Sequence, residues 1–389
     1  MHTSRPRLCS WLLASVLAGC QLSDATQLDR SGPAGTVADG GTPDAQVTTD
    51  GGEPIDVSVM ALNLHCLKLD GTPFSTNTAR MAAVADAVAA EGIAALALQE
   101  VCKNTREDGM ALLTTELRRA TGTDWTGAWI KVHDAWVGTP DQAEEGIAVL
   151  ARGQTTNPQE IVYATQAGLL RKSLGLTLSG VHGLKLFSVH LEVSDAVARA
   201  KQGRETAPFA VTTADPSVDI VVAGDFNDVE GSAAHTAMTA YDFVDYSQGL
   251  SSTRIDHVFV HRGAAWELRS NQLILDGTKY PRVTDHPGGV VAKMRKRNAP
   301  SVVRTRFVGS QDVGLGNLLY LRGGSLPLVW SGGYRAVLVA PPATWKLVVT
   351  GYAQSQALEY KWLRNDQDWQ LGANENGVGG QDNAAQPRF

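Results

Sequence analysis

The sequence has no excess of basic residues. Its 389 residues include 34 Lys and Arg against 40 Asp and Glu, which gives a formal net charge of -6. Proteins that bind nucleic acids in general usually carry a basic patch or stripe. The charge balance therefore gives no support to a general nucleic-acid binder, but it does not exclude an enzyme that needs a carboxylate-lined metal site.

Long apolar segments are equally scarce. The run from Leu8 to Val16, preceded by Arg5 and Arg7, is typical of an N-terminal targeting signal, and no later run approaches the roughly 20 residues of a transmembrane helix. Leu17-Ala18-Gly19-Cys20 follows and resembles the bacterial lipobox. This resemblance implies that Cys20 is lipidated after cleavage. The alternative is an ordinary signal peptide whose cysteine is incidental.

Residues 20–53 lack the apolar side chains needed to build a core. The segment consists mainly of Gly, Thr, Asp, Ala and Pro, and it contains Asp-Gly-Gly twice. We interpret it as a flexible tether that follows a signal peptide at residues 1–19. Gln21, and not aspartate, follows the lipobox cysteine, so the resemblance also implies an exported protein anchored in the bacterial outer membrane, on its periplasmic or cell-surface face.

The remaining chain is too long for one ordinary core, so two folded units are expected. In the first, residues 54–298, a β-rich run at 55–64 precedes apolar residues at helical spacing over 78–92 and a second strand at 93–100. A short crossover of this kind places the two strands parallel in one sheet. Further strand-like runs occur at residues 146–152, 174–180, 184–192, 219–227 and 254–261.

Many of these strands end in polar residues that a strand interior would reject. The polar residues in question are Asn63, Glu100, His190, Asp225, Asn227, Asp256, Asp285 and His286. In α/β enzymes, catalytic groups gather at the edge of a sheet, and repeated polar strand ends fit this arrangement. Hard oxygen donors suit Mg²⁺ or a similar ion, and a histidine next to a carboxylate suits a general base.

Six short motifs carry these residues in a fixed order: ALNLH, LALQE, SVHLE, AGDFND, RIDHVFV and TDHPGGV. Together they resemble the successive motifs of the endonuclease/exonuclease/phosphatase superfamily over about residues 55 to 297. That superfamily includes secreted deoxyribonucleases, abasic-site endonucleases, bacterial sphingomyelinases and inositol-polyphosphate phosphatases. The resemblance implies a metal-dependent hydrolase of phosphoester bonds with a four-layer α/β/β/α sandwich fold, in which two β-sheets pack face to face with helices outside.

The resemblance also implies the metal ligands. Glu100 is expected to bind Mg²⁺, or Mn²⁺ or Ca²⁺ in its place, with Asn63 and Asp285 completing the site at the metal or through its water. Some nucleases of the superfamily have an acidic residue two positions after the motif asparagine, where this chain has His65. This departure favours one metal over two, and we interpret His65 as a rim or packing residue.

The remaining motif residues take catalytic roles by the same resemblance. Asp225 and Asn227 are expected to orient the attacking water and the phosphoryl oxygens. His286, oriented by Asp256, is expected to act as the base, and His190 to stabilise charge that develops in the transition state. His133, His182, His235 and His261 match no motif of the superfamily and receive no role.

The second unit, residues 299–389, consists of short β-like runs separated by Gly and Pro, which predicts a small all-β sandwich. The strings VGLGNLLYLRG, LVWSGG and EYKWLRNDQDWQLGANENG resemble the starch-binding, immunoglobulin-like carbohydrate modules of many glycosidases. The resemblance implies a polysaccharide partner, with Trp330, Trp362 and Trp369 as rings that stack on sugars. The alternative is that two of the three are core tryptophans. Because all catalytic candidates precede residue 298, the unit is expected to be separable.

The sequence leaves the substrate open. Residues 113–142, with Trp125, Trp129 and Trp136, are interpreted as a loop region that helps to select it. These tryptophans either contact a lipid interface, as in a sphingomyelinase-like phospholipase, or pack within a long insertion. We place a nuclease slightly ahead of a phospholipase or phosphatase, and expect a monomer. A glycan-binding surface protein with an idle catalytic domain is the alternative from a different class, and the intact motif set argues against it.

Cysteine is rare, and its placement predicts a disulfide. Of the four cysteines, Cys9 and Cys20 belong to the N-terminal signal, which leaves Cys66 and Cys102. Each lies just past a proposed metal ligand, at equivalent ends of two strands expected to be parallel. Neighbouring strands are about 4.8 Å apart, within the Cα range of a disulfide. Export would supply an oxidising compartment. The alternative is two buried free thiols.

Overall fold

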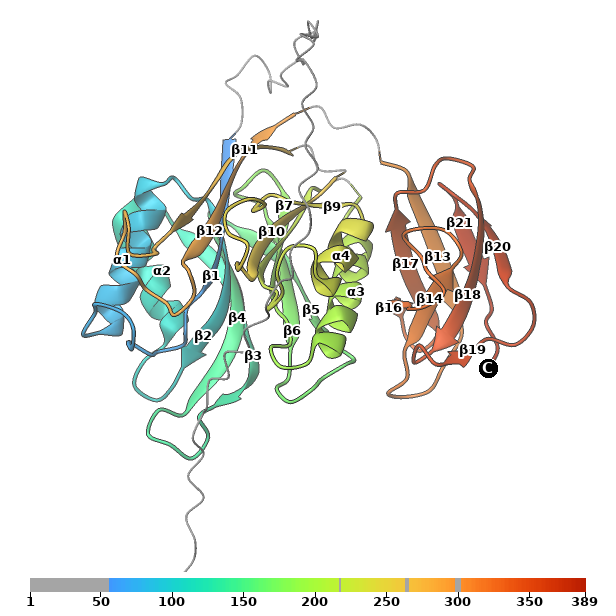
Figure 1. Cartoon of the computed structure of the whole chain (residues 1–389), viewed down its shortest axis with the longest axis horizontal. Helices are drawn as coiled ribbons and strands as arrows, with labels where there is room; N and C mark the ends of the chain where they lie inside the picture. Colours follow the sequence, from blue (N-terminus) through green and yellow to red (C-terminus); the bar gives the residue numbers. More distant parts are fainter. Residues whose placement is uncertain (1–55, 217, 263–265, 298–301) are drawn as a thin grey trace, which may run out of the picture. The chain divides into compact units, whose positions relative to one another are not determined.

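The computed structural model describes residues 56–216, 218–262, 266–297 and 302–389 (Figure 1). The predicted signal peptide, the tether and the lipidation site at Cys20 lie outside these residues, as do the predicted domain boundaries. Among the helices of the described residues, none is long and apolar enough to cross a membrane.

Two six-stranded sheets form the centre of the first folded unit. The first sheet has the strand order β11-β12-β1-β2-β4-β3. Its strands are β1 (Asp56–Asn63), β2 (Ala95–Lys103), β3 (Trp125–Ala135), β4 (Ala143–Arg152), β11 (Trp266–Ile274) and β12 (Gly289–Lys296). As predicted, β1 and β2 are parallel, and Asn63 lies opposite Gln99. This register brings Asn63 and Glu100 to the same end of the sheet.

The second sheet has the strand order β5-β6-β7-β8-β10-β9. Its strands are β5 (Thr155–Val162), β6 (Lys172–Leu178), β7 (Leu184–His190), β8 (Ile220–Asp225), β9 (Phe243–Asp245) and β10 (Asp256–His261). Asp225, the last residue of β8, lies opposite His190 on one side and Asp256 on the other. Three predicted site residues therefore stand side by side at one sheet edge.

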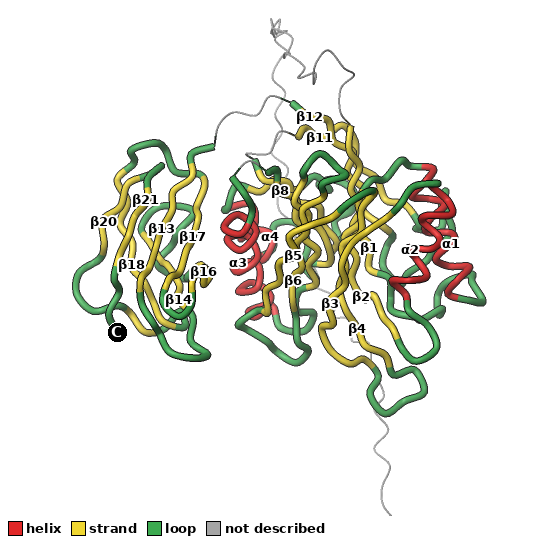
Figure 2. Tube along the Cα trace, turned by 180° about the vertical axis from the view of Figure 1, so that it is seen from behind, coloured by secondary structure: helices red, strands yellow, loops and turns green. Residues whose placement is uncertain are grey.

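The two sheets pack face to face, and helices cover their outer faces (Figures 1 and 2). The inner core contains apolar side chains from both sheets, including Ala61, Val149, Leu176, Val221 and Val258. The helices α1 (Asn77–Ala90) and α2 (Gly109–Thr121) pack on the first sheet, and α3 (Ala196–Thr213) and α4 (Ala233–Ala240) on the second. This arrangement confirms the predicted four-layer α/β/β/α sandwich.

Residues 113–142 are not the loop region that the sequence suggested. They hold most of α2 and all of β3, which pairs with β4 from Trp125 to Ala135. Trp125 is buried, and the indole of Trp129 donates to the carbonyl oxygen of Val101 at 2.8 Å. A long antiparallel ladder satisfies the backbone groups that an irregular insertion would leave unpaired. Of the three tryptophans, only Trp136, just past the strand, is exposed.

The C-terminal residues form an all-β unit of two sheets, as predicted. The strand orders are β16-β17-β13-β21 and β15-β14-β18-β19, and β20 also pairs with β18. The strands are β13 (Arg304–Ser310), β14 (Leu319–Gly323), β15 (Tyr334–Arg335), β16 (Val337–Ala340), β17 (Thr344–Thr350), β18 (Ala357–Arg364), β19 (Asp368–Trp369), β20 (Glu375–Val378) and β21 (Asp382–Ala385). Their apolar side chains, such as Phe307, Leu347 and Tyr360, join one buried cluster.

The three tryptophans proposed for sugar binding do not lie together. Trp362 on β18 is fully buried, so its predicted role is wrong, because a ring inside the core cannot stack on a sugar. Trp330 and Trp369 are neighbours, with ring centroids 6.1 Å apart, and Trp369 is 42% exposed. The guanidinium of Arg322 lies over the Trp369 ring at 5.2 Å. Sugar binding by this pair stays a prediction.

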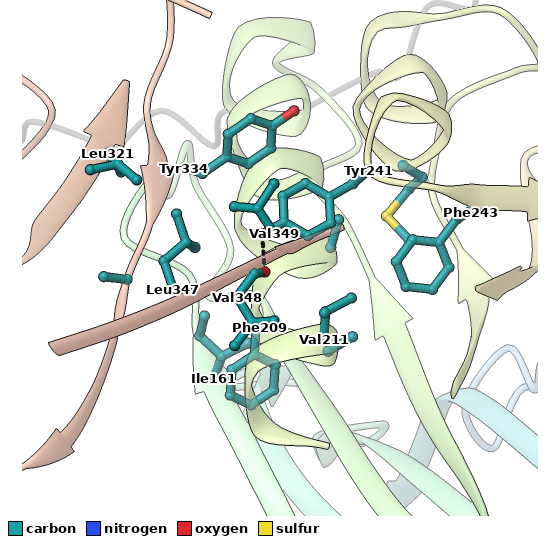
Figure 3. Close-up of a cluster of buried hydrophobic side chains, with 14 of the residues drawn as sticks. Ile161, Phe209, Val211, Tyr241, Phe243, Leu321, Tyr334, Leu347, Val348 and Val349 are labelled. Carbon is teal, nitrogen blue, oxygen red and sulfur yellow. Dashed lines mark hydrogen bonds between the residues drawn. The ribbon is translucent and has the colours of Figure 1, made fainter. Parts of the chain in front are cut away.

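The C-terminal unit shares a buried apolar cluster with the helices on the second sheet (Figure 3). Phe209 of α3 and Tyr241, which follows α4, belong to the same cluster as Tyr334 and Val348. The hydroxyl of Tyr241 donates to the carbonyl oxygen of Val348, whose amide donates to Thr212 Oγ1 at 2.9 Å. The sequence predicted a separable module, and this shared core leads us to the opposite expectation.

Candidate active site

Asp225 is the centre of the site. Asn63 Nδ2 donates to Asp225 Oδ2 at 3.3 Å and to Glu100 Oε1 at 2.9 Å. His190 Nε2 and His286 Nε2 lie 3.4 Å and 3.6 Å from the same Asp225 oxygen. The fold therefore brings together side chains that are up to 223 positions apart, between Asn63 and His286, around one carboxylate.

His286 and Asp256 form a hydrogen-bonded pair beside Asp225. His286 Nδ1 lies 2.8 Å from Asp256 Oδ2, and the Asp256 side chain is almost completely buried. Burial by itself would lower the pKa of His286, but the hydrogen bond to Asp256 and the charges of Asp256, Asp225 and Asp285 raise that pKa to about 10. Asp256 therefore fixes the ring and favours its protonated form, while Nε2 faces Asp225.

The turn after β8 holds Asp225 and Asn227 in a fixed arrangement. The Asn227 amide donates to Asp225 Oδ1 at 2.8 Å, and Asn227 Nδ2 donates to the carbonyl oxygen of Leu191 at 3.0 Å. Gly224 has a φ of 144°, and a Cβ on it would lie 2.2 Å from the carbonyl oxygen of Val189. Only glycine fits at this position, which explains the glycine of the AGDFND motif.

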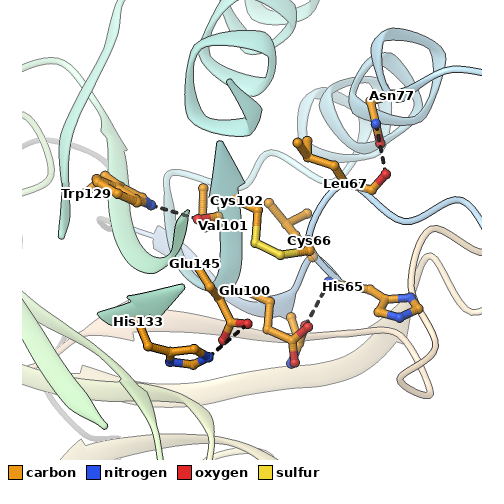
Figure 4. The surroundings of a disulfide bond; sticks show 12 residues. His65, Cys66, Leu67, Asn77, Glu100, Val101, Cys102, Trp129, His133 and Glu145 are labelled. Atoms are coloured by element: carbon orange, nitrogen blue, oxygen red, sulfur yellow. Dashed lines mark hydrogen bonds and ion pairs between the residues drawn. A yellow bond between two sulfur atoms is a disulfide. The ribbon is translucent and has the colours of Figure 1, made fainter. Parts of the chain in front are cut away.

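Glu100 owes its orientation to an irregularity in β2. The pairing of β2 with β4 shifts register between Leu98 and Val101, and Glu100 has a φ of 48°. A β-bulge re-aims side chains in this way, and non-glycine residues with positive φ gather at functional sites. The disulfide between Cys66 and Cys102, with Cα atoms 4.7 Å apart, lies directly beside this turn (Figure 4).

The acidic residues of the site fit a divalent cation. Burial, together with the charge of Glu145, raises the pKa of Glu100 to about 7, and the charges of Asp225 and Asp285 add to the rise. Burial and the charge of Asp256 raise the pKa of Asp225 to about 7. A divalent cation would offset the negative charges that raise the pKa of Glu100, and carboxylate oxygens are ligands that Mg²⁺ prefers.

These groups line a pocket of about 450 Å³. Its lining includes Glu100, His190, Asp225, Asn227, Asp285 and His286 of the predicted set, and also His133, Asp134, Ala135, Trp136, Glu145, Leu169, Arg171 and Val193. Asn63 and Asp256 lie behind the surface, where they contact Glu100, Asp225 and His286. The eight predicted residues thus belong to one continuous site, and the additional lining comes from β3, the start of β4 and the loops after β3, β5 and β7.

Comparison with known proteins identifies the family. The family model described as "Endonuclease/Exonuclease/phosphatase family" matches residues 60–286, more than half of the chain. The chain belongs to this family. Its members hydrolyse phosphoester bonds, so the predicted family and its general chemistry are confirmed. No curated protein matches the chain.

The chain is also similar to several solved structures. An endonuclease/exonuclease/phosphatase family protein from Leptotrichia buccalis is 18% identical, with a TM-score of 0.49, and the match covers 61% of this chain and 99% of that one. A protein from Beutenbergia cavernae is 17% identical, with a TM-score of 0.48 and coverage of 83% and 99%. Sphingomyelinase C from Streptomyces griseocarneus is 15% identical, with a TM-score of 0.43 and coverage of 62% and 100%.

In this family member, a buried arginine of α1 holds two of the loops that carry site residues. Arg80 Nη1 donates to the carbonyl oxygens of Leu64 (2.8 Å) and Val283 (3.2 Å), and Nη2 donates to that of Cys66 (2.5 Å). Leu64 and Cys66 follow Asn63, and Val283 precedes Asp285. Sequence reasoning missed Arg80, although an arginine among the apolar residues of a predicted helix is a usable signal.

Two further histidines, His65 and His133, lie beside carboxylates at the site. His65 Nδ1 lies 3.6 Å from Asp285 Oδ1, and its ring is largely buried, in accord with a rim or packing residue. His133, which received no role from the sequence, lies in the pocket with Nε2 3.4 Å from Glu145 Oε2. His133 stands on β3, within the stretch interpreted as a loop region, so no sequence motif marked it.

Three groups of side chains in the described residues are close enough to hold a metal. They are Cys66, Cys102 and Glu145; His235, Asp245 and His257; and Asp225, Asp256 and His286. The two cysteines of the first group form a disulfide. The second group already has a cation, since Arg254 Nη1 lies 2.7 Å from His257 Nδ1 and Nη2 lies 3.3 Å from Asp245. The third is the acid–base cluster around Asp225, and Glu100 and Asp285 belong to none of the three groups.

Proposed function

We propose that the chain is a divalent-metal-dependent phosphodiesterase. The observation that carries this proposal is the convergence of Glu100, Asp225 and Asp285 with the His286–Asp256 pair in one pocket. Glu100 and Asp285 would hold Mg²⁺, Mn²⁺ or Ca²⁺, and Asn63 would orient Glu100 through its hydrogen bond. The cation would polarise the phosphoryl group and offset its charge. An idle domain would be expected to have lost at least one of these groups.

The pKa shifts of His286 and Asp225 favour a division of roles that differs in part from the sequence-based expectation. The neighbouring carboxylates keep a proton on His286, whose pKa is raised to about 10, whereas burial and Asp256 raise the pKa of Asp225 to about 7. An acid–base group works best when its pKa lies near the working pH. Asp225 therefore takes the proton of the attacking water, and protonated His286 donates to the phosphoryl group.

Asn227 and His190 complete the proposed machinery. Asn227 is held by its bond to Leu191 and orients the water or a phosphoryl oxygen, as the sequence predicted. Burial lowers the pKa of His190 well below its usual value, and the positive charges of Arg171, His286 and His133 lower it further. A neutral His190 can donate a hydrogen bond to the phosphoryl group without adding a buried charge, which stabilises charge as it develops.

An apolar rim favours a phospholipid over a nucleic acid as the substrate. Trp136, Leu169 and Val193 line the catalytic pocket from three different loops and are 38%, 46% and 56% exposed. A nucleic-acid site would place lysine and arginine there to contact phosphates. Exposed apolar groups around a pocket instead mark contact with an apolar partner. This reverses the slight preference for a nuclease drawn from the sequence.

The proposed location agrees with such a substrate. We propose, from the lipobox resemblance alone, that the protein is exported and anchored to the outer membrane through Cys20. A tether of Gly, Thr, Asp and Pro would let the catalytic unit reach a nearby lipid surface. We also keep the proposals of a monomer and of a polysaccharide partner for the C-terminal unit, the latter supported only by the neighbouring Trp330 and Trp369.

The catalytic proposal is tested with bis-p-nitrophenyl phosphate. Hydrolysis should require Mg²⁺ or Mn²⁺ and stop in EDTA, and Asp225→Ala and His286→Ala should each lower kcat at least about 10²-fold. His182→Ala, which changes an exposed histidine on the turn before β7, is the matched control and should keep the wild-type rate. Folded Asp225 and His286 variants with wild-type rates, or activity in EDTA, would contradict the proposal.

The substrate proposal is tested with vesicles of phosphatidylcholine and sphingomyelin against plasmid DNA. The triple change Trp136→Ser, Leu169→Ser and Val193→Ser should lower hydrolysis of vesicles at least about 10-fold, because roughly 25 cal/mol is lost per Å² of apolar contact. Hydrolysis of bis-p-nitrophenyl phosphate should stay unchanged. Leu315→Ser removes an exposed leucine in the C-terminal unit and is the control. Efficient cleavage of DNA, unaffected by the triple change, would favour a nuclease.

A further inference from the structure

Arg171 is a buried cation of the catalytic pocket to which no motif assigns a role. It directly precedes β6, lines the same pocket as Glu100 and His286, and is 3% exposed. Among the described residues that line this pocket, it is the only lysine or arginine. Its charge reaches the proposed machinery, since it adds to the effect of burial in lowering the pKa of His190.

The backbone of Arg171 is fixed by the loop between β5 and β6. Gln166 accepts a hydrogen bond from the Arg171 amide at 2.9 Å and donates to its carbonyl oxygen at 3.2 Å and to that of Tyr163 at 2.7 Å. The Tyr163 amide also donates to the Arg171 carbonyl oxygen at 3.3 Å. These hydrogen bonds close the loop at its base, so the backbone position of Arg171 beside the pocket is fixed before any ligand binds.

The guanidinium itself has no bonding partner among the residues that the structure describes. Its Nε is buried without a hydrogen bond, and no carboxylate among the described residues forms an ion pair with it. Its charge does act on Glu192: burial raises the pKa of that carboxyl, but the hydrogen bonds from Ser194 lower it and the charge of Arg171 lowers it further. Arg80 and Arg254, the two most deeply buried arginines, behave differently. Arg80 donates to three carbonyl oxygens, and Arg254 contacts Asp245 and the Asp256 carbonyl oxygen.

A buried charge without a partner is strongly unfavourable, because its lost hydration is not replaced. The planar guanidinium presents several donors in a fork that matches the oxygens of a phosphate. We propose that Arg171 binds a non-bridging oxygen of the substrate phosphoryl group, and that this anion supplies the partner that the folded chain lacks. This inference rests on the proposed phosphodiesterase function, and it adds a substrate-binding residue outside the six motifs.

The test compares Arg171→Met and Arg171→Lys with Arg152→Met. Arg152, at the far end of β4, also has a buried Nε without a partner but does not line the pocket. Inorganic phosphate is the probe, and its binding in Mg²⁺ buffer is measured by the rise in Tm. We expect Arg171→Met to weaken phosphate binding at least about 10-fold and to lower kcat/KM on bis-p-nitrophenyl phosphate at least about 10²-fold, in line with the loss of a preorganised charged donor. Arg171→Lys should lie between Met and wild type.

Stability separates substrate binding from a structural role. If the guanidinium has no partner until an anion binds, Arg171→Met without phosphate should have a Tm equal to or above that of the wild type, because the substitution removes an unpaired buried charge. A Tm that falls further than in Arg152→Met, or unchanged phosphate binding in Arg171→Met, would overturn the proposal. If the wild type binds phosphate through Arg171 but hydrolyses no phosphodiester, the proposed function fails while the anion site stands.

Discussion

Removing the Cys66–Cys102 disulfide should lower the stability of the catalytic unit by a predictable amount. The bond closes a loop with a sequence separation of 36. In the chain-entropy model, a loop of this length contributes roughly 3–4 kcal/mol by restricting the unfolded chain. Both cysteines are buried, so replacing them with alanine also removes packing contacts. Each lost sulfur adds about 1 kcal/mol by comparison with other small core truncations.

Calorimetry of three samples separates the two contributions. The oxidised wild type, the reduced wild type and the double variant Cys66→Ala/Cys102→Ala are unfolded under identical conditions. Reduction alone should lower Tm by on the order of 10 °C for 3–4 kcal/mol, and the double variant should unfold slightly lower still. Thiol titration of the denatured protein confirms the redox state of each sample.

The same bond should influence the site, because the Cys66 amide donates to the Glu100 carbonyl oxygen at 3.0 Å. We expect the double variant to need more Mg²⁺ for its half-maximal rate while keeping its kcat within a few-fold. Two free thiols in protein recovered from a bacterial envelope would refute the reasoning. So would an equal Tm for the oxidised and the fully reduced wild type, because loop closure would then contribute nothing.

Three further predictions concern the stability of the fold. Removal of residues 298–389 exposes the apolar cluster around Tyr241, so the truncated protein should no longer unfold cooperatively when followed by circular dichroism. A soluble truncated protein that unfolds cooperatively would show that the C-terminal unit is separable after all. Arg80→Met leaves three buried carbonyl oxygens unpaired and should lower the free energy of unfolding in urea by at least about 3 kcal/mol. The control Arg119→Met, which changes an exposed arginine, should lower it by less than about 0.5 kcal/mol, and equal losses would contradict the role of Arg80. Burial lowers the pKa of Lys185 to about 8, whereas a lysine in the unfolded chain has a pKa of about 10.4. Between about pH 8 and pH 10.4 the unfolded chain therefore binds more protons than the folded one, so the free energy of unfolding should rise with pH across this range. Lys185→Met should remove this rise, and an unchanged pH profile would show that Lys185 does not cause it.

The sequence by itself determined the catalytic fold and most of the site. The apolar periods of strand and helix are local properties, and they placed β1, α1 and β2 within a few residues of their observed bounds. Polar residues at strand ends are also visible locally, because a strand interior excludes them. Since parallel strands end at a common edge, the sequence alone was enough to expect Asn63 and Glu100 together.

The prediction was weaker where one pattern fits two structures. Residues 113–142 carry three tryptophans, and they hold most of α2, all of β3 and a short turn in place of a loop region. Trp362 and Trp369 stand seven positions apart in one aromatic string, yet one is in the core and the other on the surface. Burial of such rings depends on which strands pack against them, and no local period records that.

Only the tertiary structure decided which residues outside the motifs reach the pocket. Arg171, His133 and Glu145 lie near the ends of β6, β3 and β4, in no family motif, and they meet the catalytic groups because the two sheets face each other. The sequence predicted a separable C-terminal unit for the same reason, since it does not reveal that the cluster around Tyr241 and Val348 joins residues more than 100 positions apart. Contacts between distant segments depend on how whole layers pack, and a linear sequence read one segment at a time does not contain that information.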